Sequence, residues 1–140
     1  MKKILVGIDG SEVSFRGIKL ACDIASSTGA GVTIAYAMVP IVPDQHTDLE
    51  TAALSQKHER QWAERILDEG AETASEYGVK ADTITLGGPA AEALTDFAVA
   101  QNFDLVVVGN QGRGAVAKVL IGSVADRLAH LCTRPILIVR

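Results

Sequence analysis

This chain is organised around the stretch Val106-Val107-Val108-Gly109-Asn110-Gln111-Gly112-Arg113-Gly114, with Ile121-Gly122-Ser123-Val124 a few residues further on. A β-branched apolar run ends abruptly in glycines, and Gly122 then precedes a serine where a helix is expected to begin. Glycine lets the backbone approach a ligand closely because it has no Cβ. A helix N-terminus offers unpaired N–H groups and partial positive charge, which suit phosphate. The stretch predicts a phosphate-binding loop, and a flexible strand-to-helix connection is the alternative interpretation.

Apolar strand-like runs alternate with helical patterns along the whole chain. Strands are expected at 3–8, 32–38, 79–86, 104–108 and 135–139. Helices are expected at about 11–28, 49–77 and 122–132, with another that opens at Pro89, and a long loop is expected over 39–48. This alternation predicts an α/β fold, in which helices cover both faces of a five-stranded parallel sheet.

Helical spacing also predicts which residues face the core. Ser11 is a plausible N-cap for the first helix, and Gly29 and Gly31 are expected to terminate it. The residues expected to face inward on the first, third and fourth helices are Ile18, Ala21, Cys22 and Ala25; Leu94, Phe97, Ala98 and Gln101; and Ile121, Val124, Ala125, Leu128 and Leu131.

The carboxyl ends of two predicted strands point to one ligand site. In open parallel sheets, ligands bind at these ends, where the winding direction reverses. With strand order 3-2-1-4-5, the reversal point lies between Asp9, after the first strand, and Gly109, after the fourth. Asp9 is therefore expected at the site, although an aspartate before Gly10 also fits a turn or helix-capping role.

Composition excludes several classes of function. The chain has 140 residues, is 48% hydrophobic and carries a formal net charge of −4, with a pI near 5.3 and a mean hydropathy of +0.23. These values predict a single domain, residues 1–140, and argue against nucleic-acid or acidic-membrane partners. Two distant cysteines, Cys22 and Cys132, and no apolar run of spanning length favour a soluble cytoplasmic protein without disulfides.

The glycine pattern differs from two familiar nucleotide motifs. No Gly-Lys-Ser/Thr follows, as a Walker A loop would require, and the glycines do not follow the first strand, as in the dinucleotide fingerprint. The spacing Gly109-x2-Gly112-x9-Gly122-Ser123 instead resembles the nucleotide-binding signature of the universal stress protein family. The opening run 4–11 and the closing run 134–139 are also similar to that family, so the resemblance covers essentially the whole chain.

The resemblance implies a Rossmann-like fold of the adenine nucleotide alpha hydrolase type that binds ATP, or alternatively ADP or AMP, with Mg²⁺ accompanying the phosphates. Gly109, Gly112, Gly122 and Ser123 would surround the phosphates and ribose, while Asp9 and Ala37 would lie at the adenine end. The neighbouring backbone-contact positions would be Val108, Gln111 and Val124. Ala125 departs from members that carry a hydroxyl there, and Gln111 from members that carry a histidine. Both departures leave the backbone N–H groups in place.

The resemblance also implies a homodimer formed through the last strand, Ile136 to Val139, which would lie at an open sheet edge. Arg113 and Lys118 are candidates for pairing with a terminal phosphate, but solvated loop residues are the alternative. The scattered histidines His46, His58 and His130 do not suggest a metal site, and Trp62 fits core or interface packing.

The function expected from these features is a regulatory or protective ATP-binding module in the stress response. No residue pattern suggests a catalytic nucleophile or general base, so at most slow ATP hydrolysis is expected. Two rivals remain: a slow ATPase or phosphotransfer enzyme, and a dimeric interaction module of the same fold that binds no nucleotide.

Overall fold

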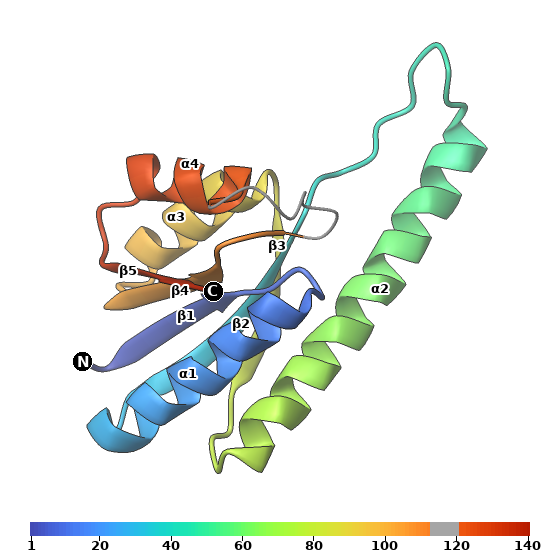
Figure 1. Cartoon of the computed structure of the whole chain (residues 1–140). Helices are drawn as coiled ribbons and strands as arrows, with labels where there is room; N and C mark the ends of the chain where they lie inside the picture. Colours follow the sequence, from blue (N-terminus) through green and yellow to red (C-terminus); the bar gives the residue numbers. More distant parts are fainter. Residues whose placement is uncertain (113–120) are drawn as a thin grey trace.

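The computed structural model describes residues 1–112 and 121–140. Helices and strands alternate in it (Figure 1). Their bounds in chain order are β1 (Lys3–Gly7), α1 (Glu12–Thr28), β2 (Gly31–Met38), α2 (Leu49–Glu76), β3 (Asp82–Gly87), α3 (Ala90–Ala100), β4 (Leu105–Gly109), α4 (Ser123–Leu131) and β5 (Ile136–Val139). The five strands form one parallel sheet of order β3-β2-β1-β4-β5. The predicted fold class and strand order are confirmed.

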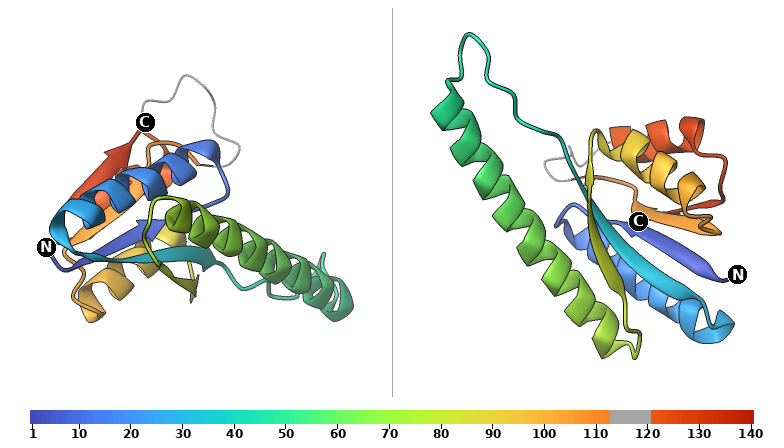
Figure 2. Two further views of the ribbon diagram at one scale, coloured as in Figure 1. Left: turned by 90° about the horizontal axis from the view of Figure 1, so that it is seen from below. Right: turned by 180° about the vertical axis from the view of Figure 1, so that it is seen from behind.

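The sheet lies between two helical layers, α1 with α2 and α3 with α4 (Figure 2). The central strands are buried on both sides: Ile4, Leu5 and Val6 of β1 have 0% exposure. Val6 contributes to the core under α1 and α2, whereas Leu5 contributes to the core under α3 and α4. The continuous apolar runs in the sequence therefore reflect strands that have no solvent-facing side.

Local signals account for the ends of α1. The Ser11 side chain accepts a hydrogen bond from the Ser14 N–H at 3.2 Å, which satisfies one of the first unpaired donors of the helix. At the other end, Gly29 adopts a left-handed conformation (φ 77°) and donates its N–H to Ala25 O at 2.8 Å. The predicted inward stripe, Ile18 to Ala25, is buried. Both bounds of this helix were predictable from neighbouring residues.

The third strand begins later than predicted. Val79 lies just beyond α2 and is bound to its last turn, because its N–H donates to Ala74 O at 3.0 Å. β3 pairs only with β2 and starts at Asp82. Its alternation of exposed and half-buried residues agrees with an edge strand.

The prediction that Gln101 faces inward is wrong. Gln101 is exposed, since it caps α3 and the chain then turns at Asn102 (φ 55°). Phe103 is 2% exposed and packs on Phe97, with ring centroids 5.4 Å apart. It occupies the core beyond that turn.

In the short helix α4, only Ala125 and Leu128 are buried. The prediction that Ile121, Val124 and Leu131 face inward is wrong: all three are exposed, and Ile121 precedes the helix. No helix within the described residues is long and apolar enough to cross a membrane.

Candidate functional site

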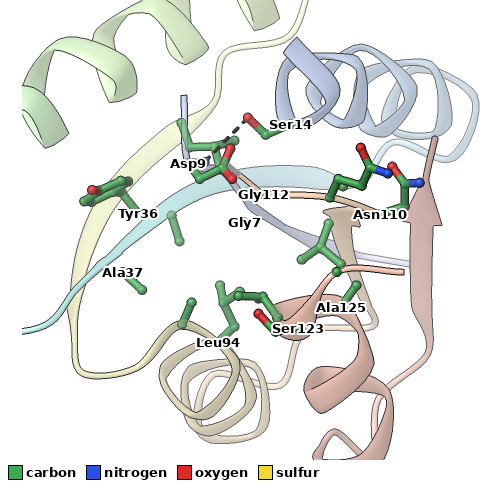
Figure 3. A pocket seen from close by; sticks show the side chains of 18 residues that line it. Gly7, Asp9, Ser14, Tyr36, Ala37, Leu94, Asn110, Gly112, Ser123 and Ala125 are labelled. Atoms are coloured by element: carbon green, nitrogen blue, oxygen red, sulfur yellow. Dashed lines mark hydrogen bonds between the residues drawn. The ribbon is translucent and has the colours of Figure 1, made fainter. Parts of the chain in front are cut away.

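A cavity opens at the carboxyl end of the sheet, where β1 and β4 lie side by side. The register pairs Ile4 with Leu105 and Val6 with Val107, so the segments that follow the two strands emerge next to each other. The cavity has a volume of about 170 Å³, and its lining residues come from both sides of the sheet's reversal point (Figure 3). Ligands of open parallel sheets bind at this location.

All nine predicted site residues line this cavity: Asp9, Ala37, Val108, Gly109, Gln111, Gly112, Gly122, Ser123 and Val124. Nine further residues line the cavity that were not predicted as site residues from the sequence: Gly7, Ile8, Ser14, Ala35, Tyr36, Ala90, Leu94, Asn110 and Ala125. Most of these lie within two residues of a predicted residue in the sequence. Ser14, Ala90 and Leu94 do not, and they come from helices that only the tertiary fold brings to the cavity.

Asp9 combines the two roles that its sequence position suggested. Its Oδ1 accepts the Ser11 N–H at 2.8 Å, which forms a turn before α1. Its own N–H donates to Ser14 Oγ at 3.5 Å (Figure 3), and Ser14 Oγ donates to Ser11 O at 2.8 Å. The other carboxylate oxygen faces the glycine loop: a Cβ added at Gly112 would lie 3.2 Å from Asp9 Oδ2. The turn therefore holds the carboxylate at the cavity wall.

The glycine loop is packed too closely to accept side chains. The Gly122 N–H donates to Asn110 O at 2.5 Å, and the Asn110 N–H donates to Val139 O at 2.6 Å. A Cβ at Gly122 would lie 3.1 Å from Asn110 O and 3.2 Å from Gln111 Cα. A Cβ at Gly109 would lie 2.8 Å from Val13 Cγ1. Glycines are thus required for the backbone to fold around this end of the cavity.

The N-terminus of α4 borders the cavity. Its N-cap is Gly122 and its first helical residue is Ser123. Glycine has no side chain to accept a hydrogen bond from the first turn. The N–H groups of the first helical residues have no intrahelical acceptor, and Ser123, Val124 and Ala125 all line the cavity. This arrangement, with the positive end of the helix dipole, suits an anionic ligand.

Charge around the cavity is sparse. Among the described residues that line it, Asp9 is the only one charged at neutral pH. Nearby, the Arg127 guanidinium of α4 donates to the Glu92 carboxylate of α3, and this hydrogen bond lowers the pKa of Glu92 below its ordinary value. The ion pair links the amino-terminal halves of two helices that both contribute to the cavity.

The remaining candidates lie elsewhere. Arg113 and Lys118 fall outside the described residues. His46, His58 and His130 are exposed on separate elements, and the described part of the chain contains no group of metal-ligating side chains large enough to hold an ion. Cys22 is buried and Cys132 is half-buried, and both are free thiols. Burial raises the pKa of the Cys22 thiol, with a smaller contribution from neighbouring Asp23.

Comparison with known proteins places the chain in a family. The model of the Universal stress protein family matches residues 1–140. This chain belongs to the universal stress protein family. A family member from Methanocaldococcus jannaschii is 32% identical over 140 residues, which cover 99% of this chain and 82% of that protein.

Solved structures of other family members share the fold. A universal stress protein in complex with cAMP has 28% identity and a TM-score of 0.75, covering 99% of this chain and 97% of that one. The family member UspA from Lactobacillus plantarum has 18% identity and a TM-score of 0.88, with the same coverage of both chains. The second likeness extends the agreement in fold to a more distant sequence.

Proposed function

We propose that this chain binds an adenine nucleotide in the cavity between β1 and β4, with ATP as its principal ligand and ADP or AMP as alternatives. The observation that carries the proposal is the meeting of a glycine-capped helix N-terminus, a close-packed glycine loop and Asp9 at one cavity. The relative described in complex with cAMP supports the same ligand class. We also propose that residues 1–140 form one domain.

The residues of the cavity divide into two ends. At one end, the first N–H groups of α4 and the backbone of Gly109, Gly112 and Gly122 would hold the phosphates. At the other end, Ala37 would contact the adenine, and Asp9 would contact the nucleoside. Because Asp9 adds negative charge to the site, the phosphates depend on backbone N–H groups and on accompanying Mg²⁺, which would neutralise part of their charge.

The role that we propose is a regulatory or protective one in the stress response, in which the nucleotide changes the state of the protein. The N-terminus of α4 and the glycine backbone, which line the cavity, supply binding and orientation. Among the nine predicted site residues, Asp9 is the one that could serve as a general base. Its Oδ1, however, accepts the Ser11 N–H in the turn before α1. Binding, rather than rapid turnover, is the function that this residue set supports best.

Nucleotide binding should stabilise the folded state. At a ligand concentration a hundredfold above the dissociation constant, the gain in unfolding free energy is about 2.7 kcal/mol. We expect thermal unfolding with ATP and Mg²⁺ to shift upward accordingly, and mass spectrometry of the denatured protein to identify any nucleotide retained through purification. ADP, AMP and cAMP, tested in parallel, rank the ligands.

Tripolyphosphate with Mg²⁺ is the matched control for charge, because it carries phosphates without adenosine and should give a smaller shift. The absence of a shift with all four nucleotides, together with no retained nucleotide, would contradict the proposal. It would favour an interaction module of the same fold.

We further propose a homodimer formed through β5. This strand is the last in the sheet order and pairs only with β4 among the described residues. Such an edge invites pairing with another chain. Sedimentation velocity is expected to give twice the chain mass of 14.7 kDa. A single species of the chain mass at high protein concentration would contradict the dimer.

A further inference from the structure

The end of the cavity that is proposed to hold the adenine is formed by residues of β2. Figure 3 shows Tyr36 and Ala37 on one side of the cavity and Asn110 and Ala125 on the other. These two sides come from β2 and from the β4–α4 region, with β1 between them in the sheet. The positions of Tyr36 and Ala37 therefore depend on what packs against the carboxyl end of β2.

That end of β2 is attached to α2 by a hydrogen bond. Tyr36 is 3% exposed, and its hydroxyl donates to the carboxylate of Glu59, which lies on α2 and is half-buried. A hydrogen bond to a charged acceptor in a partly buried setting is stronger than a neutral one. It fixes the tyrosine side chain and, through it, the backbone of the strand that carries Ala37.

A second contact joins α2 to the turn after β1, which carries Asp9. Gly10 has a left-handed backbone (φ 88°), and a Cβ there would lie 2.8 Å from Cζ2 of Trp62. The indole of Trp62 is thus pressed against the turn that carries Asp9. Glu59 and Trp62 are three residues apart on α2 and hence share a helix face.

We propose, building on the proposed nucleotide function, that Glu59 and Trp62 are positioning residues for the nucleoside end of the cavity. Glu59 acts through Tyr36 on β2, and Trp62 acts through Gly10 on Asp9. Binding of the nucleoside is therefore coupled to this face of α2, and a change in the position of α2 changes the affinity for the nucleotide. The amino-terminal half of α2 projects beyond the sheet (Figure 2), so the coupling reaches a part of the molecule outside the core.

The test uses isothermal titration calorimetry with adenosine, AMP and ATP. Tyr36→Phe removes only the hydroxyl, and Glu59→Ala removes the acceptor. Each is expected to weaken all three ligands by the same factor, about fivefold, so that the ratio of ATP to AMP affinity is unchanged. This constancy is expected because the phosphate end is formed by other elements. Glu59→Gln retains an acceptor oxygen and should bind nearly as the unaltered protein does.

The double variant Tyr36→Phe/Glu59→Ala separates coupling from independent damage. If the two side chains act as one unit, it binds no more weakly than either single variant. Trp62 is the only tryptophan, and its fluorescence is expected to change on AMP binding and to change less in Glu59→Ala. The matched controls are Glu64→Ala, at an exposed position of the same helix, and Tyr77→Phe, whose tyrosine is 41% exposed.

Several outcomes would overturn the inference. These are unchanged affinities in both single variants, effects that multiply in the double variant, or Trp62 emission that stays constant at saturating AMP. If the unaltered protein binds none of the three ligands, the proposed function itself fails, which calorimetry on that protein alone distinguishes. Thermal unfolding of each free variant verifies that the affinities compare folded proteins.

Discussion

Replacing Gly10 with alanine is expected to lower the free energy of unfolding by about 2–5 kcal/mol, which is the sum of two effects. Alanine in the left-handed region that Gly10 occupies (φ 88°) costs about 1–2 kcal/mol. Its Cβ would also lie 2.8 Å from Trp62 Cζ2, and forcing an extra methyl into packed structure costs about 1–3 kcal/mol. Urea denaturation followed by circular dichroism measures the loss.

Gly29→Ala is the matched control, because Gly29 has nearly the same backbone conformation (φ 77°) but open space where its Cβ would be. It should show only the conformational cost, about 1–2 kcal/mol. The excess at Gly10 should then disappear in a Trp62→Phe background, since phenylalanine lacks the Cζ2 atom. Equal losses at Gly10 and Gly29 would show that Trp62 does not press on this turn.

The fold was predictable where neighbouring residues decide the structure. Ser11, Gly29 and the spacing from Ile18 to Ala25 specify α1 without help from the rest of the chain. The strand order was predictable because alternating elements and the site argument together favour one topology. Predictions were wrong where the tertiary structure decides. Gln101 is at the right helical spacing but lies in the cap, and Ile121 lies before the start of α4 and is exposed.

The candidate site shows the same division. The nine predicted residues lie at strand ends or in the segments that follow β1 and β4. Topology and glycine spacing pointed to Asp9 and the glycines, whereas Ala37, Val108, Gln111 and Val124 were implied only by the family resemblance. Leu94 reaches the cavity from the first turns of α3, and Glu59 contacts Tyr36 from a separate helix. No local pattern marks these residues, because their roles depend on which helix packs over which strand end.

Gly112→Ala is expected to weaken AMP and ATP binding by at least about tenfold, or about 1.4 kcal/mol, with little effect on the unfolding of the free protein. The added Cβ would lie 3.2 Å from Asp9 Oδ2, which is closer than such atoms normally approach, so the carboxylate must move away from the cavity wall. A single side-chain end can make this adjustment cheaply in the free protein. With a nucleotide bound, the same movement removes the Asp9 contact and places a methyl group against the ligand.

Comparison with two other glycines makes the test specific. Gly87→Ala adds a Cβ in open space and should leave binding unchanged. Gly122→Val should abolish binding and also destabilise the free protein, because its Cβ would meet the backbone of Asn110 and Gln111, which cannot rotate away as a carboxylate can. Calorimetric titration and thermal unfolding of the three variants should therefore separate them into neutral, binding-deficient and doubly deficient proteins. Unaltered nucleotide affinity in Gly112→Ala would mean that the ligand does not lie between Asp9 and the glycine loop.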